Sequence, residues 1–270
     1  MDKTFNAITV EEKKSGEFFQ SIKERNIYHL PEGDLLIRVK YSSLNYKDSL
    51  SYSGNKGVTK IYPHTPGIDA MGIVEFSNTK DFNEGDKVIV TGYDLGMNTP
   101  GGFGEYIRVP REWVTLLPDN LGDSESMILG TAGMTAGLCV NTIQKKHKIQ
   151  GKKAVVTGST GGVGCIAVML LAKLGADVTA ITGKINSKDF LHSLGAKEVL
   201  LRNDYLNSVK KPLGKGVWDI AVDVAGGKML SALIANMKYG GIITCCGLVD
   251  SPSFTSSVFP FILRGINLIG

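Results

Sequence analysis

The hydrophobic pattern divides the chain near residue 118. Before that point apolar and polar positions alternate over short stretches, and Leu35, Ile37 and Val39 lie on one face of such a stretch. Similar strand-like runs follow at 72–76, 86–91 and 105–109, with turn-forming residues between them. A period of two indicates strands that are buried on one face, and no helical period is sustained here. We therefore expect a compact β-rich barrel or sandwich.

After residue 118 helical and strand-like segments alternate. Residues 123–144 have an apolar helical pattern, and short apolar runs alternate with helices from Lys152 onward. The expected strands are 153–157, 176–182, 198–201, 218–224, 242–246 and 266–269, and the expected further helices are 162–174, 188–194 and 228–237. Right-handed crossovers between such strands give a parallel, doubly wound sheet. The chain is thus predicted to be an α/β protein with domains 1–122 and 123–270.

Charge and cysteine content narrow the class of protein. The 30 basic and 26 acidic residues leave a net charge of +4, and the basic clusters are short; we expect no dedicated nucleic-acid binding. The longest apolar run, Val163–Ala172, is about half of a membrane span, and the start of the chain lacks a secretory signal. Four cysteines, two of them adjacent, make no disulfide framework. We expect a reduced, cytoplasmic protein without membrane contacts.

Glycine is unusually frequent, with 33 residues in 270, and its sharpest cluster lies at 158–164. The sequence Gly-Ser-Thr-Gly-Gly-Val-Gly follows a predicted strand and opens a predicted helix. In a G-x-G-x-x-G frame Gly161 and Gly164 fill the second and third positions, and Ser159 replaces the first glycine. Bare backbone at Gly161 admits a pyrophosphate to the helix start, and Gly164 allows close packing of helix and strand. The motif predicts dinucleotide binding; a tight turn without a ligand is the alternative.

The end of the following strand distinguishes between the two nicotinamide dinucleotides. NAD sites usually place an acidic residue there to bind the ribose hydroxyls. In this chain the strand ends in Thr182-Gly183-Lys184, and its acidic residue, Asp177, lies at the opposite end. A hydroxyl and an ammonium group suit a 2′-phosphate, so the residues favour NADP(H). An ordinary surface role is the alternative for Lys184.

Metal ligands are scarce in the first part of the chain. Residues 1–138 contain no cysteine, and His29 and His64 are far apart in the sequence. Cys245 and Cys246 would point to opposite faces of a strand and would not share a metal ion. Catalytic zinc typically needs three Cys, His or carboxylate ligands, so we expect no metal site.

Eight segments, taken in order, resemble one protein family. They are 42–48 (Ser-Ser-Leu-Asn-Tyr-Lys-Asp), 66–72 (Pro-Gly-Ile-Asp-Ala-Met-Gly), 101–106, 130–136, 158–164, 202–204, 246–248 and 259–264. Together they resemble the zinc-free medium-chain dehydrogenase/reductases, and within them the acrylyl-CoA reductases and quinone oxidoreductase-like proteins of the YhdH/YhfP type.

The resemblance implies a GroES-like substrate domain, a Rossmann domain and an active site between them. It also implies a set of cofactor-binding residues, in which Arg202 reaches the adenine or 2′-phosphate end and Leu248 and Ile262 flank the nicotinamide. The set is Tyr46, Thr160, Gly161, Gly162, Val163, Thr182, Gly183, Lys184, Arg202, Leu248 and Ile262. Members of the group are longer, so the resemblance further implies that a C-terminal return segment is missing from this sequence.

The implied reaction is the NADPH-dependent reduction of a carbon–carbon double bond conjugated to a carbonyl, with acryloyl-CoA as the expected substrate. Tyr46 is the candidate hydrogen-bond donor near the reacting groups, and Asn45 and Asp48 are candidate supports for it. A structural turn, with water or a cofactor hydroxyl as the proton source, is the alternative. Lys56 and Lys60 are candidate ligands for the CoA phosphates, or are simply solvated.

Other functions stay open from the sequence alone. The substrate could be a quinone or a free enone, and the protein could be an NADPH-binding sensor without useful turnover. The resemblance also implies a homodimer.

Overall fold

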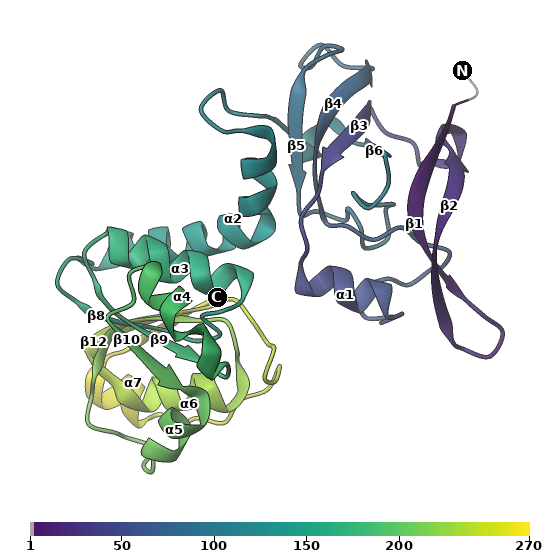
Figure 1. The fold of residues 1–270 in the computed structure, drawn as a ribbon. Coiled ribbons are helices and arrows are strands. Elements are labelled where there is room, and N and C mark those ends of the chain that lie inside the picture. The colour runs from purple at the N-terminus through teal and green to yellow at the C-terminus, as the bar shows by residue number, and fades with distance from the viewer. Residues whose placement is uncertain (1–2) are drawn as a thin grey trace. The chain divides into compact units, whose positions relative to one another are not determined.

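The computed structural model describes residues 3–270, which form two compact units that meet in the chain between Thr131 and Ala132 (Figure 1). The predicted boundary at 122 and 123 coincides with the start of the long helix α2 (Asp123–Lys146). The observed division between Thr131 and Ala132 falls within this helix, so the first turns of α2 belong to the first unit. Each unit is described separately below.

The first unit is built around a five-stranded antiparallel sheet with the order β6-β3-β4-β5-β7. Its strands are β3 (Leu35–Tyr41), β4 (Asp69–Ser77), β5 (Lys87–Thr91), β6 (Tyr106–Val109) and β7 (Val114–Leu116). Leu35 and Ile37 lie in its core, as the alternation predicts. The β-rich character of this unit is therefore confirmed.

A separate hairpin of β1 (Thr4–Glu12) and β2 (Phe18–Asn26) belongs to the same unit. Leu36, which the alternation places on the polar face of β3, is buried against Phe5 and Ala7 of β1. Both faces of β3 are thus covered at this point. The unit also contains one short helix, α1 (Tyr46–Tyr52), which the sequence pattern did not predict.

The second unit contains a six-stranded parallel sheet with the order β10-β9-β8-β11-β12-β13. The strands are β8 (Lys153–Val156), β9 (Asp177–Thr182), β10 (Glu198–Leu201), β11 (Trp218–Asp223), β12 (Met237–Cys245) and β13 (Asn267–Ile269). The order reverses direction at β8, which is the switch point of a doubly wound sheet. The predicted α/β fold class is confirmed.

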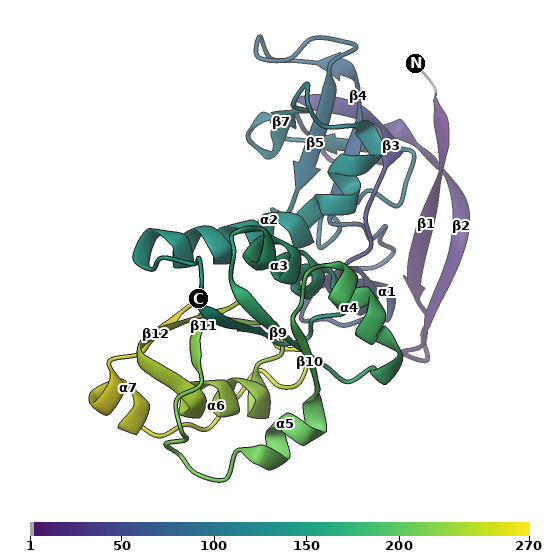
Figure 2. The same cartoon turned by 60° about the vertical axis from the view of Figure 1, so that its left-hand side comes forward.

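Helices cover both faces of this sheet (Figure 2). Residues of α2 and of α3 (Gly162–Lys173) and α4 (Lys188–Ser193) share one core with the sheet. Residues of α5 (Arg202–Ser208), α6 (Gly227–Asn236) and α7 (Phe259–Arg264) share the other. All carboxyl ends of the parallel strands therefore meet at one edge.

Helix α2 is long and apolar enough to cross a membrane by length and composition alone. It bends at Gly130, whose φ of 48° and ψ of −152° are not helical. Beyond the bend, Ala136, Val140 and Ile143 are buried in the core that α2 shares with the sheet. This packing accounts for the apolar character of the helix within the second unit.

Candidate active site

The glycine-rich turn joins the end of β8 to the start of α3. Gly158 has a positive φ of 58°, and Gly161 occupies the N-cap position without a capping side chain. A Cβ atom at Gly164 would lie 2.3 Å from the carbonyl oxygen of Gly158, so only glycine fits this close approach. The first turn of α3 therefore keeps its backbone N–H groups free of side-chain caps, as an anion site at a helix start requires.

Ser159, which replaces the first glycine of the motif, is fully buried. Its hydroxyl donates to the carbonyl of Val156 at 2.7 Å, and its N–H donates to the carbonyl of Ile181 at 3.2 Å. The side chain thus stabilises the turn. The next residue, Thr160, has its hydroxyl 3.4 Å from that of Thr182, so the turn and the end of β9 lie together.

Basic side chains follow the carboxyl ends of β9 and β10. Thr182 and Leu201 are partners in the register of the two strands. A Cβ atom at Gly183 would lie 3.5 Å from the Arg202 guanidinium, and the Lys184 N–H donates to the Thr182 hydroxyl at 3.0 Å. Gly183, Lys184 and Arg202 are thus brought together, as predicted for a 2′-phosphate site.

Asp177, the acidic residue of β9, lies at the opposite end of that strand. Its carboxylate is paired with Lys197. Strand β9 therefore has no carboxylate at its Thr182 end that would repel a phosphate. This arrangement agrees with the preference for NADP(H) over NAD(H).

Sequence reasoning missed Asp223, the last residue of β11. Its buried carboxylate accepts hydrogen bonds from the Thr157 hydroxyl at 2.7 Å and from the Gly226 N–H at 2.8 Å. Burial raises the pKa of this carboxyl group above its usual value. Asp223 ties the glycine-rich turn to the neighbouring strand end. A polar residue ending a buried strand was the available signal.

Leu248 and Ile262 lie on different elements of the second unit. Leu248 follows the carboxyl end of β12 and is 56% exposed. Ile262 lies on α7, where Arg264 donates hydrogen bonds to the carbonyls of Ala235 and Met237 near the amino end of β12.

In the first unit, Asn45, Tyr46 and Asp48 lie at the start of α1. The side chains of Asn45 and Asp48 form a reciprocal capping box, and Asp48 also accepts from the Ile68 N–H at 2.9 Å. Burial raises the pKa of Asp48, and the negative charge of Asp69 adds to this. Tyr46 is 56% exposed. The Tyr46 side chain is therefore open to solvent at the start of α1.

Sequence reasoning also missed Asp69, the first residue of β4, which is fully buried. Its carboxylate accepts from the Ser43 hydroxyl at 2.5 Å, the Asn45 amide at 2.8 Å, and the hydroxyl and N–H of Thr131 at 2.7 and 3.0 Å. Gly130 has no room for a Cβ atom, which would lie 2.7 Å from Asp69 Oδ2. Asp69 therefore joins the Asn45–Tyr46 segment to the bend in α2.

The structure gives Lys56 a local role. Its ammonium group pairs with Glu12 at 2.5 Å and lies over the rings of Phe18 and Tyr62. The prediction that Lys56 binds CoA phosphates finds no support in this arrangement. The backbone N–H of Lys60 donates to the Asn98 side chain at 3.3 Å.

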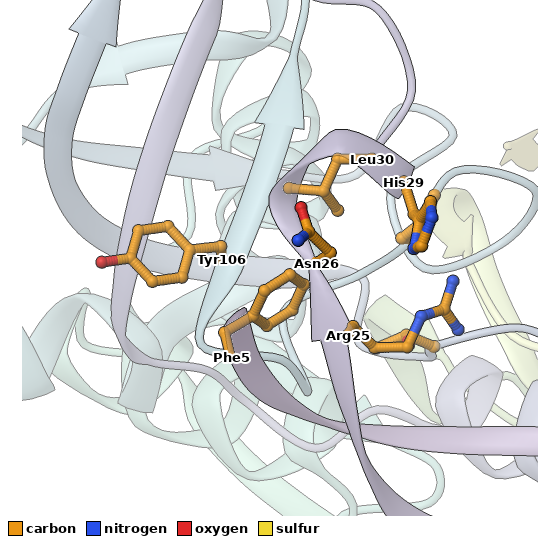
Figure 3. Close-up of a pocket in the computed structure, with 8 residues that line it drawn as sticks. Phe5, Arg25, Asn26, His29, Leu30 and Tyr106 are labelled. Carbon is orange, nitrogen blue, oxygen red and sulfur yellow. The ribbon is translucent and has the colours of Figure 1, made fainter. Parts of the chain in front are cut away.

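A small hollow in the first unit lies between β1, the end of β2 and β6 (Figure 3). Phe5, Arg25, His29 and Tyr106 are among its lining residues. Its free volume of about 10 Å³ corresponds to about one water molecule. It has no room for an organic substrate, and none of the predicted site residues lines it.

Residues 3–270 contain no group of three or more His, Cys, Asp or Glu side chains that is placed to hold a metal ion. His64 is buried, and no hydrogen-bond partner is present for its Nε2 atom within this range. Cys245 packs in one core of the second unit and Cys246 packs in the other. These donors do not fit a zinc site with three protein ligands.

Both units match models of known protein families. Residues 31–119 match the alcohol dehydrogenase GroES-like domain, and residues 162–270 match the zinc-binding dehydrogenase family. Acrylyl-CoA reductase AcuI of Ruegeria pomeroyi is 39% identical over 268 residues, which cover 98% of this chain and 81% of AcuI.

Two solved structures are similar over nearly the whole chain. The YhdH oxidoreductase of Salmonella enterica in complex with NADP has a TM-score of 0.93 and 39% identity, covering 98% of this chain and 81% of that one. Bacillus subtilis YhfP with NAD bound has a TM-score of 0.94 and 41% identity, covering 99% and 82%. The chain therefore belongs to the medium-chain dehydrogenase/reductase family, in the quinone oxidoreductase-like group that contains YhfP, YhdH and AcuI.

Proposed function

We propose that the protein is a zinc-independent, NADPH-dependent reductase that converts acryloyl-CoA to propionyl-CoA. The structural observation that carries this proposal is the uncapped start of α3 beside Lys184 and Arg202, because it offers a pyrophosphate site next to a cationic 2′-phosphate site. The similarity to AcuI supports the choice of substrate.

The residues of the second unit would hold the cofactor, and they fit it. The N–H groups of 162–164 and the hydroxyls of Thr160 and Thr182 would hold the pyrophosphate, and Lys184 and Arg202 would neutralise the 2′-phosphate. When bound, NADPH supplies a hydride to the β carbon of the substrate. Asp223 keeps the turn in place beside the end of β11.

The residues of the first unit would serve the carbonyl side of the reaction. Negative charge develops on the thioester oxygen as the β carbon is reduced, so a hydrogen-bond donor lowers the barrier. The exposed Tyr46 hydroxyl is our candidate for this donor, and a proton then reaches the α carbon from Tyr46 or from water. Asn45, Asp48 and Asp69 act as positioning residues.

Zinc independence rests on the donor set. The matched family is described as zinc-binding, yet this chain has Ile68 and Asp69 where a histidine and a glutamate follow the glycine in zinc-dependent relatives. Asp69 is already saturated by hydrogen bonds from Ser43, Asn45 and Thr131.

A quinone is the second candidate substrate. A pig quinone oxidoreductase is 26% identical over 220 residues, and quinones are reduced by the same hydride donor. A sensor that binds NADPH without useful turnover is the third candidate. We also propose a cytoplasmic homodimer, and native mass spectrometry tests the oligomeric part of this proposal.

Parallel assays of NADPH oxidation test the proposal. Purified protein is given acryloyl-CoA, a simple quinone or a free enone at matched concentrations. We expect the highest kcat/KM for acryloyl-CoA. Quinone turnover far above acryloyl-CoA turnover would reject the thioester substrate, and NADPH binding without turnover of any of the three would favour the sensor.

A further inference from the structure

A long groove crosses the second unit between α5, α6 and the segment 250–257, which we call the α5–α6 groove. Helices α5 and α6 lie side by side (Figure 2), and the groove has a volume of about 1080 Å³. Helix α6 has ten residues, so the groove runs for about 15 Å along it. This is enough room for a large, extended ligand.

Positive charge lines the groove. Lys210 and Lys211, which follow α5, and Lys228, in the first turn of α6, are among its lining residues. The structure shows no hydrogen bond or ion pair for these three ammonium groups within residues 3–270. Asp250 is the only carboxylate among the described lining residues, and it accepts a hydrogen bond from the Lys228 N–H at 3.0 Å. The groove is thus suited to an anion with several charges.

Apart from the three lysines and Asp250, the described lining residues are uncharged. Val209 and Phe254 supply apolar surface, and five Ser and Thr residues of 251–257 supply hydroxyl groups. Apolar surface and hydroxyl groups beside three ammonium groups match a ligand that carries phosphates on an uncharged arm.

One end of the groove adjoins the strand ends that are predicted to face the nicotinamide. The Asp250 N–H donates to the carbonyl of Ala225 at 2.8 Å. A Cβ atom at Gly226 would lie 3.3 Å from the Cα atom of Leu248. The groove therefore begins where β11 and β12 end, beside a predicted cofactor residue.

Other lysines of the chain are less suitable for this role. Lys56 is already paired with Glu12. A second basic hollow contains Lys145, Lys146 and Lys148, but Gln150 and Leu174, which also line it, precede β8 and β9. That hollow lies at the amino ends of the strands, away from the cofactor turn.

We propose that the α5–α6 groove binds the phosphate-bearing part of a CoA thioester, with Lys210, Lys211 and Lys228 as the phosphate ligands. This inference rests on the proposed function, because it assigns the part of the substrate that does not react. The groove then determines specificity for CoA thioesters over smaller thioesters and free enones.

The test compares two thioesters that share the reacting group. The triple variant Lys210→Gln/Lys211→Gln/Lys228→Gln is assayed with acryloyl-CoA and with acryloyl-N-acetylcysteamine, which lacks the phosphates. We expect KM for acryloyl-CoA to rise about tenfold or more, as for the loss of charge-assisted contacts. Kinetic constants for the truncated thioester and the Kd of NADPH should not change.

Lys145→Gln/Lys146→Gln/Lys148→Gln is the matched control, because it removes the same charge from the other basic hollow. Equal KM changes for both thioesters, or an equal effect of the control, would overturn the assignment. If the wild-type protein reduces neither thioester, the proposed function fails; titration of the NADP⁺-saturated protein with adenosine 3′,5′-bisphosphate then still tests the groove. Wild-type binding that the triple variant loses would support an anion site there, and equal binding would reject it.

Discussion

Two buried carboxylates that the sequence did not single out organise the residues of the candidate site. Asp69 and Thr131 are separated by 62 positions, and Thr157 and Asp223 by 66. Each aspartate stands at the end of an apolar run, where a sequence pattern indicates only that a strand begins or ends. The hydrogen-bond partners come from distant segments, so local periodicity carries no information about them. Asn45 and Asp48, by contrast, are three residues apart, so their hydrogen bond is a local feature of the chain.

Asp69→Asn should weaken the connection between the Tyr46 segment and the bend in α2. An amide presents an NH2 group to donors that now face a carboxylate, so at least one hydrogen bond is lost. We expect the free energy of unfolding to fall by about 1–3 kcal/mol. We also expect kcat to fall while the Kd of NADPH stays unchanged, because Asp69 lies outside the predicted cofactor turn.

Asp119→Asn is the control for this variant, since Asp119 is an exposed aspartate of the same unit. Unfolding by urea and steady-state kinetics measure both effects. A stable Asp69→Asn protein with unaltered kcat would show that Asp69 has no positioning role.

His64 should make stability depend on pH. Burial lowers the pKa of this histidine below 6.5, so the unfolded chain binds a proton more readily than the folded one. The free energy of unfolding should therefore fall as the pH drops below about 6.5, by at most about 1.4 kcal/mol per pH unit. His64→Asn should lose this part of the pH dependence.

Urea unfolding between about pH 7.5 and pH 5 measures the difference between wild type and variant. His29→Asn, at an exposed histidine of the same unit, should behave like the wild type. An equal acid-side slope in the wild type and in His64→Asn would contradict the effect assigned to His64.

At the scale of elements, the sequence predicts those whose pattern is long or regular. Most strands of the parallel sheet, and helices α3, α4 and α6, are close to their predicted bounds, because buried apolar runs alternate there with helical segments. The short helices α5 and α7 were not predicted, and β12 begins at Met237, before its predicted start at residue 242. Helix α1 has only seven residues, too few to show a period. Strand β2 is largely exposed and shows no alternation of apolar and polar residues. Its extended conformation comes from its pairing with β1. Leu36 of β3 shows that the β1–β2 hairpin can bury a side chain that alternation places on the polar face of a strand.

Gly164→Ala should disturb the junction of β8 and α3. The new Cβ atom would meet the Gly158 carbonyl at 2.3 Å, so the turn must shift. We expect a loss of about 1–3 kcal/mol in the free energy of unfolding and weaker NADPH binding, which thermal unfolding with and without NADPH measures.

Gly137→Ala is the matched helical control, because a Cβ atom there meets nothing within 4 Å. It should leave stability unchanged or increase it by about 0.5–1 kcal/mol. Unaltered NADPH binding in Gly164→Ala would contradict the role of the turn.

At the scale of the whole molecule, the fold class and the family could be predicted from the sequence. Eight short segments carry the resemblance, and both units match the corresponding family models. The α5–α6 groove could not be predicted, since α5, α6 and 250–257 come together only through the crossover of the chain from one strand to the next. The lysines that line it lack any motif in the sequence.

We propose that the second unit binds NADPH at the carboxyl ends of its strands. The most direct measurement is kcat/KM for acryloyl-CoA reduction with NADPH and with NADH, in the wild type and in Lys184→Ala/Arg202→Ala. We expect the wild type to prefer NADPH by about tenfold or more, and the double variant to lose most of this preference without losing activity with NADH. Equal efficiency of the two cofactors in the wild type would contradict the account.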